Sequence, residues 1–186
     1  NKIGLNALVN NKGFRNDGSL YYGSQILKLI NEDTSTNDFK FNNTFSKIKD
    51  GKSRFEYSEK INELAVDELH DLLFFCKKNN INVVGFTPPF ANSVYDKMIS
   101  SNKYLYINSL EKKLIKVFNK YNYEFHNYPS GKLLGSNDDQ FIDGFHGGEV
   151  VSLNILIDML KKHSILNEVT EIDKLYNDIK NKKNIF

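Results

Sequence analysis

The sequence has little of several features that would mark particular classes of protein. It has one cysteine, Cys76, so no internal disulfide is possible. It has no run of about 20 apolar residues, so we expect no membrane-spanning helix. Its formal net charge is only +2, because 25 Lys and Arg residues stand against 23 Asp and Glu residues. This near balance gives no electrostatic case for binding nucleic acid.

The rest of the composition is typical of a globular protein, with 40% hydrophobic, 26% charged and 13% aromatic residues. The 186 residues suit a single domain, 1–186, that is long enough to bury a sizeable core. Nearly all basic residues are Lys, and Arg15 and Arg54 are the two arginines. The abundance of Asn, Lys, Ile and Phe is typical of an AT-rich genome, so most Asn and Lys carry no functional signal.

From Ser58 onward the apolar spacing predicts helices that alternate with short strands. The expected helices cover 58–79, 91–101, 105–118, 150–162 and 171–183. The expected strands cover 81–87 and 123–128, and Pro88-Pro89 ends the first because proline cannot donate to a strand ladder. Helices between strands predict an α/β fold with a parallel sheet covered on both faces. Cys76 lies on an apolar helical face, where we expect it to pack in the core.

The first part of the chain has weaker patterns. The alternation of Ile3, Leu5 and Ala7 predicts a short strand, and turn-forming residues predict an ordered loop over 13–23. Residues 24–31 have the spacing of a short helix, and 31–56 read as a long polar excursion with one short helix.

Polar residues follow both predicted strands. The segment 87–92 follows the first, and the loop that leads to Asp143 and His146 follows the second. Ligands in open α/β sheets bind beyond the carboxyl ends of the strands, and both segments would open on the same edge. This convergence predicts a site there.

Asp143 and His146 are three residues apart in a glycine-rich stretch before an apolar helix. The Asp143 carboxylate could accept a hydrogen bond from Nδ1–H of His146, which would fix the tautomer and leave Nε2 to take a proton from a nucleophile. Gly144 would allow the tight turn between them. The alternative is that Asp143 caps the following helix and His146 is an exposed surface residue.

The other histidines are expected to be structural or solvated, His126 on a strand and His70 and His163 on helices. A metal site would have to gather residues without a recognised ligand spacing: Asp138, Asp139, Asp143, His126 and His146. We expect no metal and no other cofactor.

Asp143-Gly144-Phe145-His146 resembles the Asp-x-x-His block near the C-terminus of SGNH/GDSL hydrolases. The stretch 83–90, Val-Val-Gly-Phe-Thr-Pro-Pro-Phe, is similar to the late strand and Pro-Pro turn of that fold. The stretch 13–23 is similar to a segment of SGNH-like proteins that modify bacterial cell-surface polysaccharides, including relatives of the alginate O-acetylation proteins. The resemblance implies a three-layer, flavodoxin-like (SGNH-type) parallel sheet flanked by helices, with Asp143 as triad acid and His146 as base.

The serine nucleophile of that family lies in a Gly-x-Ser motif after the first strand, and a glycine and an asparagine from early strands complete its oxyanion site. None of the three is found here, because Ser19 and Ser24 do not follow a strand into a helix. The chain therefore resembles the C-terminal portion of such a domain, with an incomplete sheet whose early strands are absent. An exposed sheet edge favours a partner, either a homodimer or a missing N-terminal segment of the same protein.

By resemblance, the chain is an SGNH-type esterase or O-acyltransferase domain that acts on a carbohydrate or acylated glycan of the cell envelope. Arg15 and Asn92 are the expected substrate-lining residues, and the resemblance implies an extracytoplasmic location, with the cytoplasm as the alternative. A second hypothesis is a non-catalytic glycan-binding or scaffold module with a degenerate hydrolase fold. A metal-dependent hydrolase is the third.

Overall fold

The structure is a computed structural model that describes residues 38–181, together with residues 2–3, 13–15, 20–21, 28 and 31. Its α-helices are α3 (Asn42–Asp50), α4 (Glu63–Lys78), α5 (Asn92–Ser100), α6 (Ile107–Asn119), α7 (Glu149–Lys161) and α8 (Ile172–Asn181). Its strands are β1 (Lys2–Ile3), β2 (Gly13–Arg15), β3 (Leu20–Tyr21), β4 (Val84–Thr87) and β5 (Glu124–Asn127). Short 3-10 helices are η1 (Phe39–Phe41), η2 (Gly131–Leu134), η3 (Asp138–Gln140) and η4 (Ile165–Glu168).

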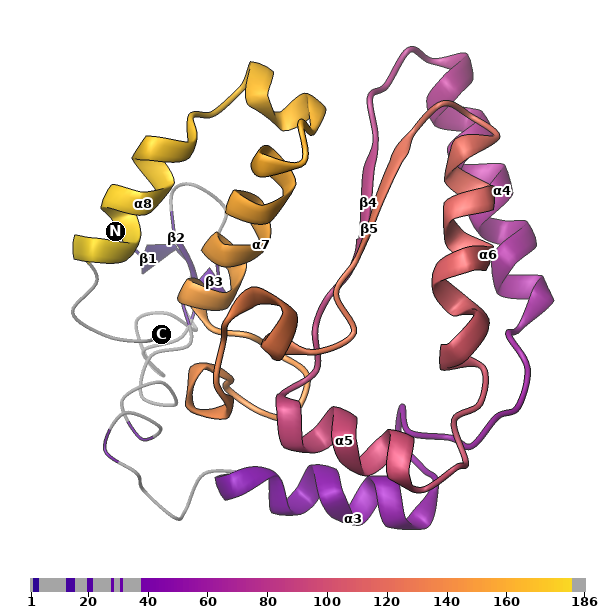
Figure 1. Ribbon diagram of the computed structural model, residues 1–186, viewed down its shortest axis with the longest axis vertical. Coiled ribbons are helices and arrows are strands. Elements are labelled where there is room, and N and C mark those ends of the chain that lie inside the picture. The colour runs from indigo at the N-terminus through magenta and orange to yellow at the C-terminus, as the bar shows by residue number, and fades with distance from the viewer. Residues whose placement is uncertain are drawn as a thin grey trace.

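β4 and β5 form a parallel pair, with Val84 opposite Glu124 and Thr87 opposite Asn127. In Figure 1, α4 and α6 lie on one side of this pair and α7 and α8 on the other. Gly85 allows α6 to approach β4 closely, because a Cβ there would lie 2.3 Å from the Phe118 ring. The predicted α/β class with parallel strands between helices is confirmed at this level.

The segments that follow β4 and β5 lie side by side, as predicted. The Phe90 amide donates to the Pro129 carbonyl at 3.3 Å, and the Gly131 amide donates to the Phe90 carbonyl at 3.0 Å. The Ala91 amide donates to the Gly144 carbonyl at 3.0 Å, which joins the Asp143 stretch to the same place. The largest apolar cluster packs beside this junction, and its members include Ile48 of α3, Val94 and Met98 of α5, and Val151 and Met159 of α7.

Helix α4 begins later than predicted. Its N-cap is Asn62, whose side chain accepts from the amides of Leu64 and Ala65. Ser58, the predicted cap, instead forms a local turn with Lys60 through its hydroxyl. The helix ends at the C-cap Asn79, as predicted. Its buried residues are Val66, Leu73 and Cys76, so the expected core position of Cys76 is confirmed.

Of the predictions for the N-terminal part of the chain, some are confirmed and others are wrong. The strand expected at Ile3 is confirmed as β1, but the loop expected over 13–23 is wrong for residues 13–15 and 20–21. These form β2 and β3, and the order β1-β2-β3 is antiparallel. Lys28 is helical and Asn31 lies in a turn, and the rest of the helix predicted over 24–31 lies outside the described residues. The polar excursion contains α3, a longer helix than expected.

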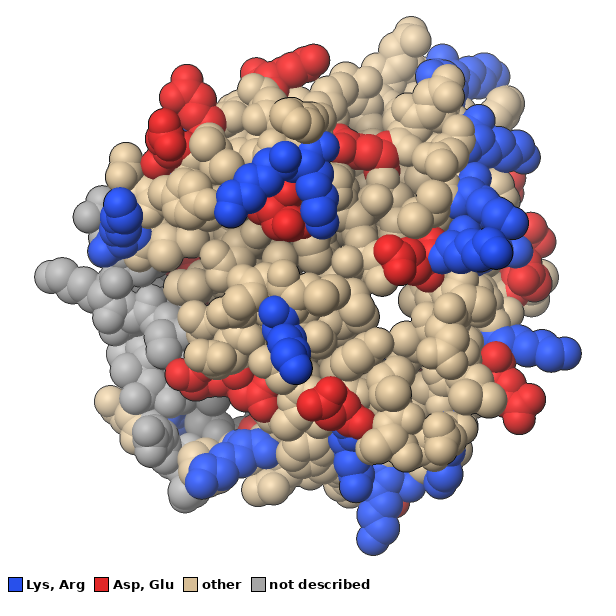
Figure 2. All heavy atoms as spheres, viewed as in Figure 1, with Lys and Arg blue, Asp and Glu red and all other residues tan. Residues whose placement is uncertain are grey.

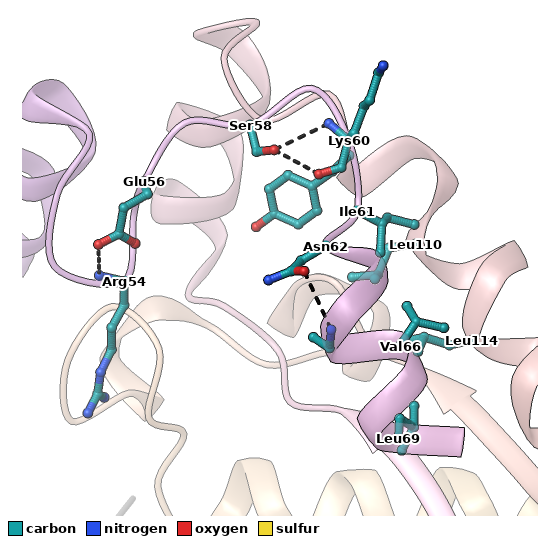
Figure 3. A pocket seen from close by; sticks show the side chains of 12 residues that line it. Arg54, Glu56, Ser58, Lys60, Ile61, Asn62, Val66, Leu69, Leu110 and Leu114 are labelled. Atoms are coloured by element: carbon teal, nitrogen blue, oxygen red, sulfur yellow. Dashed lines mark hydrogen bonds between the residues drawn. The ribbon is translucent and has the colours of Figure 1, made fainter. Parts of the chain in front are cut away.

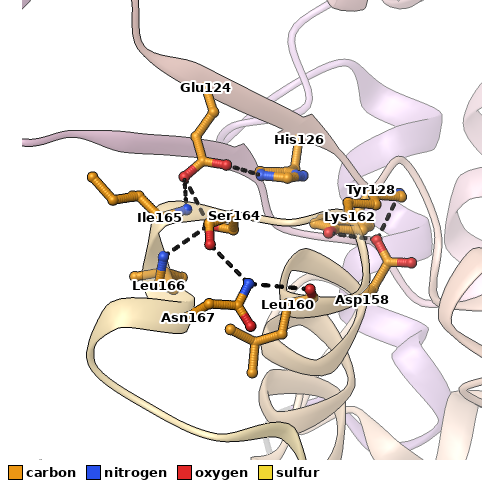
Figure 4. Close-up of polar contacts among 10 residues, drawn as sticks. All are labelled: Glu124, His126, Tyr128, Asp158, Leu160, Lys162, Ser164, Ile165, Leu166 and Asn167. Atoms are coloured by element: carbon orange, nitrogen blue, oxygen red, sulfur yellow. Dashed lines mark hydrogen bonds and ion pairs between the residues drawn. The ribbon is translucent and has the colours of Figure 1, made fainter.

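Strand β5 is attached to α7 and η4 by two polar clusters (Figure 4). The Glu124 carboxylate accepts from the Ser164 hydroxyl at 2.7 Å and from the Ile165 amide at 3.0 Å. Just past β5, the Tyr128 hydroxyl donates to Oδ2 of Asp158 at 2.7 Å. The same oxygen lies 2.6 Å from Nζ of Lys162.

These contacts shift the pKa values of Tyr128 and Asp158 in opposite directions. Burial raises the pKa of Tyr128, and its hydrogen bond to Asp158 adds to the shift. Burial also acts to raise the pKa of Asp158, but hydrogen bonds from Lys162 and Tyr128 outweigh it, so the pKa lies below its ordinary value of 3.8. The ionised form of Asp158 is therefore the one that stabilises the fold.

We expect Asp158→Asn to lower the free energy of unfolding by about 1 kcal/mol at neutral pH, because the ion pair with Lys162 is lost. A lowered folded-state pKa gives stability that is complete above 3.8 and is lost as the pH falls through the folded-state pKa. The difference between wild type and variant should therefore shrink below pH 3.8, as urea denaturation at a series of pH values would show. Asp178→Asn, on the exposed surface of α8, is the matched control. If the free energy of unfolding falls by the same amount in wild type and Asp158→Asn as the pH is lowered, the stabilising role of ionised Asp158 is contradicted.

Candidate functional site

The Asp143 stretch is a closed loop anchored at both ends. Phe141 and Gly147 form an isolated antiparallel bridge, and the Ile142 amide donates to the His146 carbonyl at 2.8 Å. The Phe141 side chain is buried, which fixes one end in the core. The loop therefore presents Asp143 and His146 from a rigid base.

The Asp143 carboxylate uses both of its oxygens. Oδ1 accepts from the amides of Phe145 at 2.9 Å and His146 at 2.8 Å, and Oδ2 lies 2.7 Å from Nδ1 of the His146 ring. An ionised carboxylate only accepts hydrogen bonds, so Nδ1 carries the proton, and Nε2 is the free nitrogen of the neutral ring. The predicted contact between the Asp143 carboxylate and the His146 ring is confirmed.

The two side chains differ in exposure. The Asp143 side chain is 23% exposed and that of His146 is 55% exposed. The carboxylate is therefore partly shielded while the ring faces outward. This is the arrangement that a general base needs, since its free nitrogen must reach a substrate or nucleophile.

The alternative role of Asp143 as a helix cap is wrong. Helix α7 has Gly148 as its N-cap, and no side chain caps it. Asp143 instead closes its own turn by accepting hydrogen bonds from the amides of Phe145 and His146. The acid therefore positions the histidine and not the helix.

Gly144 allows this turn to pack against α3 and α5. A Cβ at this position would lie 2.6 Å from Cγ2 of Thr44 and 2.9 Å from Cγ2 of Val94. Thr44 is itself held by Asp38, which accepts from its hydroxyl at 2.6 Å. The tight turn predicted at Gly144 is therefore also a point of close packing.

Asn92 is the first residue of α5, beside the same junction. Its Oδ1 accepts from the Lys132 amide at 2.6 Å, and its Nδ2 donates to the Ser136 carbonyl at 2.9 Å. The side chain thus fastens the η2 loop to α5, and its role in lining a substrate site stays a prediction. Arg15 is in β2, but its side chain lies outside the described part of the structure, so its role also stays a prediction.

The acidic residues and histidines of the metal alternative have separate partners. Asp138 accepts from the amide of Ser93 at the start of α5, and His126 lies 3.1 Å from a Glu124 oxygen. His163, predicted on a helix, follows α7 in a left-handed conformation with φ 61°. Over residues 38–181, no three His, Cys, Asp or Glu side chains gather to hold a metal ion.

Phe145, which contacts the His146 ring, and Arg54, which contacts Phe145, were not predicted from the sequence as part of the site. The Phe145 ring lies 4.3 Å from the His146 ring between centroids, and the guanidinium carbon of Arg54 lies 5.5 Å from the Phe145 centroid. Arg54 also lines an open pocket of about 350 Å³ between the N-terminal ends of α4 and α6 (Figure 3). The one available signal was that Arg54 is an arginine in a chain whose basic residues are almost all Lys.

The charged surface does not favour one class of polyelectrolyte partner. In Figure 2 acidic and basic side chains are interspersed over the face shown, with basic ones gathered near α4 and α6. Within the described residues, no helix is both long enough and apolar enough to cross a membrane. Comparison with protein-family models, curated proteins and solved structures gave no match to this chain.

We expect the His146 ring to be the Nδ1–H tautomer when neutral, because Asp143 Oδ2 can only accept. In Asp143→Ala the ring should shift toward the Nε2–H tautomer, which is seen directly in ring 15N chemical shifts by long-range 1H–15N correlation. Asp139→Ala is the control, since Asp139 is an exposed acid of η3, just before this loop. Unchanged ring shifts in Asp143→Ala would show that the carboxylate does not set the tautomer.

Proposed function

We propose that this chain carries the acid–base half of an SGNH-type esterase or O-acyltransferase site that acts on an acylated glycan of the cell envelope. One observation carries the proposal: Oδ2 of Asp143 lies 2.7 Å from Nδ1 of a His146 ring that is itself more than half exposed. A merely structural Asp–His pair gains nothing from leaving the second ring nitrogen accessible at the carboxyl edge of a parallel strand pair.

The chemistry follows from the protonation of the ring. His146 Nε2 takes the proton from a serine hydroxyl as the serine Oγ attacks the carbonyl carbon of the ester. Asp143 stabilises the imidazolium that forms, and His146 then returns the proton to the sugar oxygen as the ester bond breaks. Water releases the acyl group from the serine in an esterase, and a second sugar hydroxyl accepts it in an acyltransferase.

Among the described residues, no serine is hydrogen-bonded to the His146 ring, whose partner is Asp143. We propose that the nucleophile comes from another segment that adds strands to the β4–β5 pair and completes a flavodoxin-like sheet. Apolar side chains that remain exposed support such an addition: Leu64, Leu72 and Phe75 on α4, and Phe86 on β4. Parallel sheets are usually wider than two strands and covered on both faces. A second copy of the chain or an N-terminal segment of the same protein would suit this role.

A non-catalytic glycan-binding or scaffold module is the second candidate. The observation that favours it is the same lack of a serine at His146 among the described residues. In that case, the Asp143–His146 pair would serve only to hold the loop. An extracytoplasmic location belongs with either candidate, since both act on an envelope glycan.

When the segment that supplies the serine is present, a fluorophosphonate probe should label one serine, and aryl acetate should be hydrolysed. His146→Asn should lower both rates by about 10⁶-fold, because removal of a triad base removes activation of the nucleophile. His163→Asn is the matched control, since His163 is exposed and asparagine tolerates its left-handed backbone.

The two candidates give different results in this experiment. Labelling that depends on His146 and not on His163 supports acyl transfer. If no serine is labelled, or if labelling is equal in wild type and His146→Asn, the enzyme proposal is contradicted and the binding module is favoured.

A further inference from the structure

Arg54 has a backbone conformation that arginine rarely adopts. The Phe55 amide donates to the Lys52 carbonyl at 3.2 Å and closes a turn whose central residues both have positive φ, 53° at Ser53 and 77° at Arg54. Turns with two positive φ values are dominated by Gly, Asn and Asp, because other side chains crowd the backbone. Strained residues of this kind cluster at functional sites.

The turn is held in place by its buried neighbour. The Phe55 side chain is 2% exposed, and its carbonyl accepts from the Tyr104 hydroxyl at 2.8 Å. The Phe55 ring also packs edge-on against Phe145, with 6.0 Å between centroids. The core therefore fixes Phe55, while the side chain of Arg54 beside it is exposed.

The fixed turn places the Arg54 guanidinium over Phe145, the ring that also contacts His146. The guanidinium carbon lies 5.5 Å from the Phe145 ring centre, which lies 4.3 Å from the His146 ring centre. The guanidinium carbon and the imidazole centre can be no further apart than the sum of these distances. A cation over an aromatic ring is favourably placed, so Phe145 orients Arg54 as well as contacting His146.

The guanidinium has no acceptor within the part of the chain that the structure describes. The nearby Glu56 carboxylate accepts from the backbone amide of Arg54, at 3.3 Å, and not from its side chain. A guanidinium has five N–H donors in a planar fork that matches a carboxylate or a phosphate. Arg54 therefore offers unused donors beside Phe145, whose ring contacts the proposed base.

The pocket in Figure 3 extends from the same residue. Arg54 lies at one end, with its guanidinium pointing away from the apolar wall formed by Ile61, Val66 and Leu114. A ligand group held by the guanidinium would thus lie outside the apolar part of the pocket.

We propose that Arg54 binds an anionic group of the ligand, a carboxylate or a phosphate, and holds the ligand against His146. This inference rests on the proposed function at one point, because it takes the ligand to be the glycan substrate of His146. Arg54 acts as a positioning residue: its fork binds the acidic group in a bidentate manner, and the neighbouring acyl ester then faces Nε2. The substrate class is accordingly an acylated sugar that also carries an acidic group.

Binding can be measured without turnover. Wild-type protein is titrated with glucuronate, with inorganic phosphate and with uncharged glucose, while NMR follows the amides of Phe145 and His146 and the side-chain Nε–H of Arg54. We expect saturable shifts with at least one anion and none with glucose. The anion that binds more tightly identifies a carboxylate or a phosphate as the recognised group.

Arg54→Asn should weaken anion binding about ten- to a hundredfold, the loss of a charge-assisted hydrogen bond. It should leave the unfolding temperature unchanged or higher, because asparagine tolerates a left-handed backbone. Arg54→Lys keeps the charge but loses the planar fork of donors. Its affinity for the anion should lie between those of wild type and Arg54→Asn. Lys52→Gln removes an equal charge two residues away and should bind as wild type.

Equal anion affinity in wild type and Arg54→Asn would overturn the proposal, as would equal binding of glucose and glucuronate. Failure of serine labelling would count against acyl transfer and leave anion binding by Arg54 standing. Anion binding that is insensitive to Arg54, together with labelling that depends on His146, would overturn the role of Arg54 alone.

Discussion

The hydrogen bonds of the Asp143 carboxylate are the contacts on which the candidate site depends. One oxygen closes the turn by binding two consecutive amides, and the other orients the His146 ring. Because one carboxylate does both, the backbone turn and the ring orientation cannot vary independently. Hydrogen bonds to an ionised acceptor are roughly twice as strong as neutral ones, so this short segment can hold a defined geometry.

The parallel strand pair explains why that turn lies where it does. β4 and β5 end at the same edge, and the segments after them are tied to one another and to Gly144 by backbone hydrogen bonds. Polar side chains then secure the surrounding loops: Asn92 fastens η2, and Glu124 fastens η4. Each of these buried or half-buried groups has a partner, as unpaired polar groups in an interior are costly. The site therefore lies where the loops that follow β4 and β5 form their hydrogen bonds, at one edge of the sheet.

The sequence predicted the parts that rest on short-range patterns. Helical spacing and Pro88-Pro89 located α4 to α8 and β4, and the Asp-x-x-His spacing predicted the carboxylate–ring contact. Helix starts were less predictable, because Ser58 and Asn62 are both good caps, and in the structure Asn62 is the cap. β2 and β3 were missed because strands of two or three residues carry almost no periodicity.

Long-range contacts could not be predicted in this way. Nothing in the local sequence shows that Arg54 lies over Phe145, ninety-one residues later, or that the Asn92 side chain spans to the η2 loop. The positive φ at Arg54 is equally hidden, since the turn is imposed by the burial of Phe55. Asn92 was predicted to line a substrate site, but its side chain holds the η2 loop. Arg54 was not predicted to belong to the site, yet its guanidinium lies over the ring that contacts the proposed base.

The central claim is that Asp143 leaves Nε2 of His146 as the accessible, unprotonated nitrogen. Diethyl pyrocarbonate acylates unprotonated imidazole nitrogens, and the site and rate of modification can be followed for all four histidines by mass spectrometry and NMR. The account predicts that His146 is modified first, and at Nε2. Modification of His146 at Nδ1, or of His163 before His146, would contradict it.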